Sequence, residues 1–166
     1  FTRENIIAGF VDFLVTIGVK PDYPETGYGY IKGIDGATGD EIAVDKFVEK
    51  PDLETAKKYV ASGNYFWNSG IFVWKTSIIL ERFRELMPSH YDAFRPLMLL
   101  DHMKIASMAD DIKKLKERIF SSIDSISIDY GILEKSGNRM VIPAEFGWAD
   151  LGSWKAADDI LDAGQG

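Results

Sequence analysis

The sequence predicts an α/β protein in which a mixed β-sheet is flanked by helices. Short runs rich in β-branched and aromatic residues alternate with segments whose apolar residues recur at helical spacing. The chain has 166 residues, which suits one domain with a core large enough to fold. Hydrophobic residues make up 46% and charged residues 27%, values typical of globular proteins rather than of disordered or fibrous chains.

The first strands are predicted from apolar runs that end at turn residues. Residues 14–19 form a β-rich run that stops before Pro21 and Pro24, so a buried strand followed by a loop is expected. A second strand over 28–34, a glycine-containing turn and a third strand over 42–48 together predict a hairpin.

The rest of the chain is predicted to be mostly helical. Asp52 caps a helix that runs to Gly63, and after a strand over 71–74, Thr76 or Ser77 caps the next helix, which ends at Pro88. Residues 89–135 have a helical pattern, 139–146 return to strand, and a last helix begins near Ser153. The candidate buried positions between 89 and 135 are Tyr91, Phe94, Leu97, Met98, Ile112, Leu115, Ile119, Ile128, Ile132 and Leu133.

Charge and composition restrict the function. A net charge of −7 and a pI near 4.8 disfavour a nucleic-acid partner, because no compensating basic stripe is present. No apolar run reaches the roughly 18 residues that a membrane span needs, and the chain has no cysteine, so a cytoplasmic protein is expected. A phosphorylated ligand would have to be held by a local cation, because the overall field repels it.

Two segments carry an acid beside residues suited to a ligand. Residues 24–30 place Glu25 and two glycines between aromatic residues, so that backbone can approach a ligand while Glu25 accepts from hydroxyl groups; the alternative is a loop entering a strand. Residues 47–51 end a strand in Glu49, which can accept from sugar hydroxyls, and Lys50, which can meet a phosphate; the alternative is an exposed ion pair.

Two further segments lie at the borders of predicted strands. In 67–70, Asn68 can donate to and accept from sugar hydroxyls and Trp67 offers a flat wall, unless the segment is only a turn beside a core tryptophan. In 147–154, Asp150 can be one ligand of Mg²⁺, a cation that takes one or two carboxylates plus substrate phosphates. Alternatively, Asp150 or Ser153 caps the last helix.

The segments together resemble mannose-1-phosphate guanylyltransferases. The motifs Pro-Glu-Thr-Gly-Tyr-Gly-Tyr-Ile, Phe-Val-Glu-Lys-Pro, Trp-Asn-Ser-Gly-Ile-Phe, Ser-Ile-Asp-Tyr-Gly-Ile-Leu-Glu-Lys and Trp-Ala-Asp-Leu-Gly-Ser-Trp occur in the family's order between residues 14 and 154. The resemblance implies a nucleotide-diphospho-sugar transferase (Rossmann-like) fold. Its amino-terminal, nucleotide-binding half is expected to be missing, because no glycine-rich phosphate loop occurs here. Residues 1–13 are then a leader or a joined fragment, and 14–166 are the sugar-phosphate-binding part.

The resemblance also implies roles for single residues. Lys50 would hold the sugar phosphate, while Glu49, Asn68 and Glu25 with Gly27 would hold the sugar. Asp150 would be one of two aspartates that bind Mg²⁺, and Lys50 and Asp150 would be the catalytic residues. Mannose 1-phosphate would attack GTP to give GDP-mannose and pyrophosphate, a reaction that needs no general base.

Other functions stay open at this point. They are a sugar-phosphate-binding module without transfer, a nucleotidyltransferase for another hexose 1-phosphate, and a scaffold whose exposed aromatic residues bind a protein. The two histidines, His90 and His102, are expected at the surface. An open sheet edge is expected where the missing half belongs, and it would favour formation of a homo-oligomer.

Overall fold

The structure is a computed structural model that describes residues 12–37, 39–100 and 109–150. It divides into two compact units, which are described separately. Unit 1 comprises Phe1–Val73 and Asn138–Gly166, and unit 2 comprises Trp74–Gly137. The predicted last helix from Ser153, His102 and residues 1–11 of the predicted leader lie outside the described residues.

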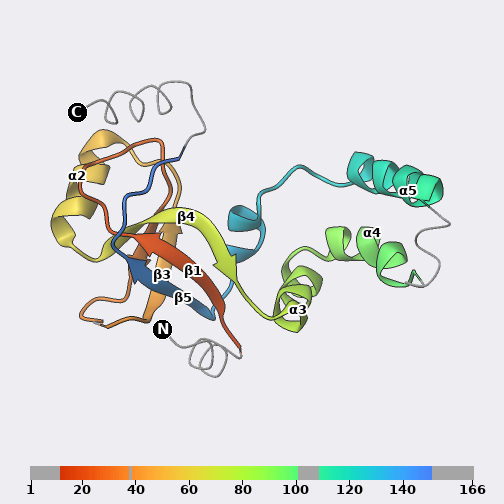
Figure 1. Cartoon of the computed structure of the whole chain (residues 1–166), viewed down its shortest axis with the longest axis horizontal. Helices are drawn as coiled ribbons and strands as arrows, with labels where there is room; N and C mark the ends of the chain where they lie inside the picture. The colour runs from red at the N-terminus through yellow and green to blue at the C-terminus, as the bar shows by residue number, and fades with distance from the viewer. Residues whose placement is uncertain (1–11, 38, 101–108, 151–166) are drawn as a thin grey trace. The chain divides into compact units, whose positions relative to one another are not determined.

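Unit 1 is built on five strands that close into a barrel (Figure 1). The strands are β1 (Leu14–Val19), β2 (Tyr30–Gly33), β3 (Ile42–Val48), β4 (Tyr65–Val73) and β5 (Arg139–Ala144), in the order β1-β4-β2-β3-β5. β1 and β5 are parallel and the other pairs are antiparallel, so the predicted mixed sheet is confirmed. The predicted open edge is wrong, because β3 pairs with β5 at Ile42 and Val141 and closes the described sheet.

One level of the barrel brings the ends of several strands together. Tyr30 pairs with Val48 on one side and with Trp67 on the other, Trp67 pairs with Val19, and Val19 pairs with Ala144. β2 begins at this level, whereas β1, β3 and β5 end there. The segments 20–29, 49–51 and 145–150 therefore all start from or return to the same level of the barrel.

Helix α2 (Leu53–Ser62) covers one side of the barrel core, as Figure 1 shows. Its buried Ala56 joins the cluster around Tyr30 and Trp67, and Tyr59 stacks on Tyr65 with a centroid distance of 3.8 Å. The predicted helix limits are confirmed by two local signals. The Asp52 carboxylate accepts from the Thr55 backbone N–H at 2.8 Å, and Gly63 ends the helix at φ 73°.

Strand β4 is longer than the predicted 71–74, because it already begins at Tyr65. Asn68, Ser69 and Gly70 lie inside it rather than in a separate turn. The register of β1 and β4 shifts between Thr16 and Gly18, where the Ser69 hydroxyl donates to the Ile17 carbonyl oxygen at 2.6 Å. Gly70 has φ 70°, a conformation that suits glycine, so the strand continues past this irregularity.

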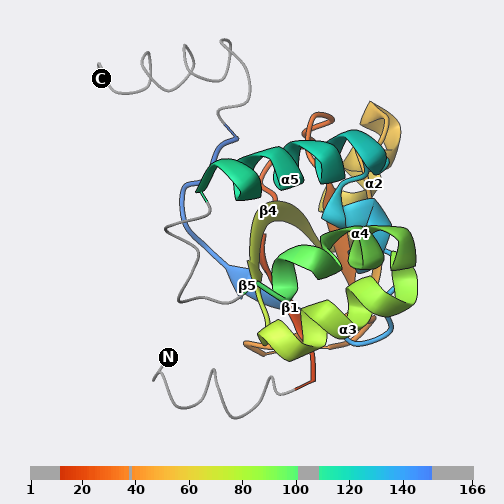
Figure 2. The same ribbon diagram turned by 90° about the vertical axis from the view of Figure 1, so that its right-hand side faces the viewer.

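Unit 2 is helical, as predicted for most of 89–135. It contains α3 (Thr76–Leu86), α4 (Pro88–Met98), α5 (Ala109–Ser122) and η2, a π-helical turn over Asp129–Leu133. α4 packs against α3 and α5, and η2 packs against α3 (Figure 2). Pro88 is the first residue of α4, so the break at this position is confirmed. The predicted cap at Thr76 or Ser77 is wrong, because Lys75 is the N-cap residue and makes no side-chain cap hydrogen bond.

The core of unit 2 is small. Of the predicted buried positions, Ile119, Ile132 and Leu133 are buried, whereas Met98 is exposed and the others are half-buried. A close contact joins η2 to Met87 at the start of α4, because a Cβ on Gly131 would overlap the Met87 Sδ atom. Only glycine fits at this position without a shift of the methionine. No helix in the described part of the chain is long and apolar enough to span a membrane.

Candidate functional site

Three of the segments singled out in the sequence meet at Gly29. A Cβ on Gly29 would lie 2.7 Å from Glu49 Oε1 and 3.5 Å from Asn68 Cβ, so both side chains pack directly over this glycine. The Asn68 backbone N–H donates to the Gly29 carbonyl oxygen at 2.8 Å, and the Asn68 side-chain oxygen accepts from the Gly70 N–H at 3.1 Å. The structure therefore brings Glu49 and Asn68 together, as the sugar-binding prediction requires.

Lys50 lies at the end of β3, directly after this group. Its Nζ atom is 3.6 Å from Glu49 Oε2, and its side chain is 69% exposed whereas that of Glu49 is 22% exposed. Lys50 also has φ 40°, the only positive φ of a non-glycine residue in the described chain, and such a conformation costs about 1–3 kcal/mol. The ion pair contributes only about 0–1 kcal/mol at this exposure, so it does not by itself explain the strained backbone.

Asp150 reaches the same region through Tyr28. Its backbone N–H donates to the Tyr28 hydroxyl oxygen at 3.2 Å, and the residue is exposed. The Trp148 ring meets Tyr28 edge-on at 4.9 Å, and Tyr28 meets Trp67 edge-on at 5.4 Å. The segment that carries Asp150 is thus attached to Tyr28, while Glu49 and Asn68 contact the next residue, Gly29.

Glu25 and Gly27 form a turn within their own loop. Glu25 Oε1 accepts from the Gly27 N–H at 2.7 Å, and the Glu25 carbonyl oxygen accepts from the Tyr30 hydroxyl at 2.8 Å. These bonds fix the loop that leads to Tyr28 and Gly29. Burial is the main reason why the pKa of Tyr30 is raised above 10.0, so its hydroxyl stays a donor near neutral pH.

Of the two alternatives for Trp67, the core tryptophan is confirmed and the wall for a sugar is wrong. Trp67 is 2% exposed and belongs to the core cluster with Val19, Tyr30 and Tyr65. Trp148, which the sequence reasoning left without a role, is half-buried and lies at the border of that cluster. Tyr28 was likewise not assigned, although its position between two glycines in an aromatic-rich loop was the available signal.

The described residues offer only a partial metal site. Within 12–37, 39–100 and 109–150, no group of three or more His, Cys, Asp or Glu residues is arranged to hold a metal ion. A single carboxylate at Asp150 fits Mg²⁺ only if substrate phosphates supply further oxygen ligands, which is a common arrangement for this cation.

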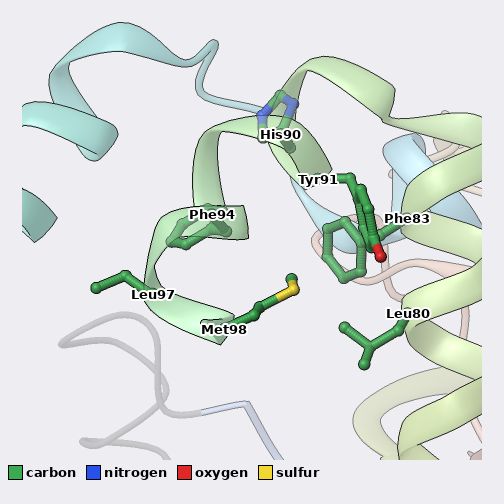
Figure 3. Close-up of a pocket in the computed structure, with 7 residues that line it drawn as sticks. All are labelled: Leu80, Phe83, His90, Tyr91, Phe94, Leu97 and Met98. Carbon is green, nitrogen blue, oxygen red and sulfur yellow. The ribbon is translucent and has the colours of Figure 1, made fainter. Parts of the chain in front are cut away.

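An apolar cavity of about 400 Å³ lies in unit 2 between α3 and α4 (Figure 3). Leu80 and Phe83 from α3 face Tyr91, Phe94 and Met98 from α4, and His90 lies at its border. The half-buried His90 places Nε2 2.9 Å from the Asp124 carbonyl oxygen. Among the described residues, no lysine, arginine or carboxylate lines this cavity, so these residues do not suit a sugar phosphate.

A second hollow, of about 600 Å³, lies in unit 1 where β1 and β5 end. It is lined by residues 20–22 and 145–147, and Lys20 Nζ lies 3.2 Å from Glu145 Oε1. This hollow is adjacent in sequence to both the loop of Glu25 and the segment of Asp150. Lys20 and Glu145 thus lie where β1 and β5 end, at the same level of the barrel as Glu49.

Comparison with known proteins identifies the family. The Nucleotidyl transferase family matches residues 6–164. The chain belongs to this family. The xanthan biosynthesis protein XanB of Xanthomonas campestris pv. campestris (strain B100) is 44% identical to this nucleotidyl transferase chain over 154 residues. That match covers 92% of this chain and 32% of XanB. Mannose-1-phosphate guanylyltransferase of Escherichia coli (strain K12) is 38% identical over 153 residues, which cover 89% of this chain and 30% of the relative.

Solved structures support the same family and fold. A crystal structure described as mannose-1-phosphate geranyltransferase from Thermus thermophilus is 33% identical with a TM-score of 0.74, covering 90% of this chain and 40% of that chain. Mannose-6-phosphate isomerase from Helicobacter pylori is 26% identical with a TM-score of 0.64, covering 84% of this chain and 53% of that one. The predicted fold class and the resemblance to mannose-1-phosphate guanylyltransferases are confirmed. This nucleotidyl transferase chain spans about a third of the length of the curated relatives it matches.

Proposed function

We propose that this chain carries the sugar-phosphate-binding residues of a nucleotidyltransferase that forms GDP-mannose and pyrophosphate from mannose 1-phosphate and GTP. The observation that supports the proposal most directly is the meeting of distant segments at Tyr28 and Gly29. Glu49 and Asn68 pack over Gly29, Lys50 follows Glu49, and Asp150 is hydrogen-bonded to Tyr28. The names of two guanylyltransferase relatives from Escherichia coli and Salmonella typhimurium support the same substrates.

The chemistry that these residues offer is binding and orientation. The exposed Lys50 ammonium can donate to the phosphate of mannose 1-phosphate, and Glu49 can accept from the sugar hydroxyls over the Gly29 backbone. The Asn68 side chain and the Glu25 loop would complete the sugar site. A phosphate oxygen attacks the α-phosphorus of GTP and pyrophosphate leaves, so orientation and charge neutralisation provide most of the catalysis.

Mg²⁺ is the cofactor that this proposal includes. Asp150 would hold it together with phosphate oxygens of the substrates. When bound, the cation would neutralise charge on the phosphates. Asp150 itself contributes a carboxylate whose backbone is fixed to the Tyr28 hydroxyl.

Calorimetric titration of the chain with mannose 1-phosphate tests the proposal. Lys50→Ala removes the ammonium and should weaken binding by about tenfold or more, since a hydrogen bond to a charged group contributes about 1.5–3 kcal/mol. Lys46→Ala is the matched control, because Lys46 is an exposed lysine of β3, four residues before Lys50. Equal affinity of wild type and Lys50→Ala would contradict the assignment of Lys50.

A sugar-phosphate-binding module without transfer is the second candidate. It is favoured by the lack of a glycine-rich phosphate loop in the 166 residues. We therefore expect these residues alone to bind mannose 1-phosphate but not to synthesise GDP-mannose, and an assay for released pyrophosphate checks this. Titration with glucose 1-phosphate separates mannose from another hexose. The cytoplasmic location and self-association stay predictions.

A further inference from the structure

Tyr28 makes contacts through both its hydroxyl group and its ring. Its hydroxyl oxygen accepts from the Asp150 backbone N–H, 122 residues along the chain, at 3.2 Å. Its ring meets both Trp148 and Trp67 edge-on, with interplanar angles of 71° and 86°. Through Trp67, which is 2% exposed, these rings are joined to the core of the barrel.

These contacts determine where Asp150 lies relative to the sugar side of the site. β5 ends at Ala144, so five residues, 145–149, separate the last paired residue of the barrel from Asp150. The Tyr28 hydroxyl and the Trp148 ring tie the end of this stretch to the loop before β2, and the ion pair between Lys20 and Glu145 joins its start to the same loop. The side chains of Glu49 and Asn68 pack over Gly29, the residue after Tyr28, and the Asn68 N–H donates to the Gly29 carbonyl oxygen. Movement of Tyr28 would therefore alter the distance between Asp150 and the sugar-binding side chains.

We propose that Tyr28 is a positioning residue that holds Asp150 at the distance from Glu49 and Asn68 at which one cation-bound sugar phosphate can contact all three. The inference rests on the proposed function. The phenol hydroxyl fixes the Asp150 amide, and the phenol ring fixes Trp148. Tyr28 itself contacts neither the metal nor the sugar in this proposal.

The test compares wild type with Tyr28→Phe, a variant that keeps the ring contacts and removes only the hydroxyl. Affinity for mannose 1-phosphate is measured once with Mg²⁺ and once with a chelator. We expect the variant to lose about threefold to tenfold in affinity with Mg²⁺ and to stay within about twofold of wild type without it, as for the loss of one hydrogen bond. Tyr59→Phe is the matched control, since it removes a hydroxyl from the same aromatic cluster on the side of α2.

A loss that is equal with and without Mg²⁺ would overturn the proposal, because it would show a merely structural role. Unchanged affinity of Tyr28→Phe under both conditions would overturn it as well.

A second measurement separates this inference from the proposed function. Mn²⁺ and inorganic phosphate, which supplies the further oxygen ligands that the Asp150 carboxylate needs, are added to the labelled chain without sugar, and broadening of the Asp150 amide signal is followed by NMR. We expect broadening in wild type at lower Mn²⁺ concentration than in Tyr28→Phe, and Tyr59→Phe should match wild type. If wild type and Tyr28→Phe differ in this way but wild type does not bind mannose 1-phosphate, the proposed function fails and the positioning of Asp150 stands. Identical broadening in wild type and Tyr28→Phe overturns the positioning role.

Discussion

Replacing Gly29 by alanine tests the packing over this glycine. The added Cβ would lie 2.7 Å from Glu49 Oε1 and 3.3 Å from Glu49 Cδ, whereas an ordinary contact begins at 3.4 Å. The carboxylate oxygen must therefore move by about 0.7 Å or more, which is enough to misalign the hydrogen bonds that we propose it makes to a sugar. Loss of a hydrogen bond to this charged group corresponds to about 1.5–3 kcal/mol, or about 10- to 150-fold weaker binding of mannose 1-phosphate.

The fold should tolerate Gly29→Ala, because Gly29 does not have the left-handed backbone conformation that disfavours alanine. Calorimetric titration gives the affinity, and urea unfolding gives the stability. Gly147→Ala is the matched control, since its added Cβ would meet no atom within 4 Å in the described structure. If Gly29→Ala is folded and binds mannose 1-phosphate like wild type, the Glu49 carboxylate does not contact the sugar and the reasoning is refuted.

Three further predictions concern stability. Lys50→Gly should raise the free energy of unfolding by about 1 kcal/mol over Lys50→Ala, because glycine relieves the strain at φ 40°; equal urea midpoints of the two variants would argue against stored strain. Asp52→Ala should lower the thermal midpoint of unfolding at neutral pH. The hydrogen bond from the Thr55 N–H lowers the pKa of Asp52 below 3.8 in the folded chain. The stability difference between wild type and Asp52→Ala should therefore disappear as pH falls below 3.8. A difference that persists in full in strong acid would be inconsistent with the cap. Burial raises the pKa of Tyr30 above 10.0, so the unfolded chain loses this proton first and stability should fall as pH rises above 10.0. Denaturant melts of wild type and Tyr30→Phe check this, and an equal alkaline decline in both would exclude Tyr30 as its cause.

The elements that the sequence predicts well are those with local signals at both ends. Strand β3 has its predicted bounds, 42–48, and α2 lies between the Asp52 cap and Gly63. The closure of the barrel could not be predicted in this way. It depends on the pairing of Ile42 with Val141, which are about a hundred residues apart and carry no local mark of their partnership.

In the candidate site, too, the sequence predicts the features that have a local signal but not those that depend on contacts between distant residues. Composition and the order of motifs point to Glu49, Lys50, Asn68 and Asp150, because charged and amide residues beside prolines and glycines are unusual at strand ends. The contacts of Glu49 and Asn68 with Gly29, and of Asp150 with Tyr28, are tertiary and have no local signal in the sequence. The sequence left two alternatives for Trp67 for a related reason, since a tryptophan beside a polar turn sequence gives no local sign that it is 2% exposed.

Oxidation of Met87 would disrupt the contact between Met87 and Gly131 in unit 2. A chain without cysteine has its sulfur only in methionine, and Met87 is 7% exposed with its sulfur against a glycine backbone. A sulfoxide oxygen would add volume and polarity where even a methyl group does not fit. Peroxide should therefore attack Met87 slowly, and once formed, the sulfoxide should separate η2 from the start of α4.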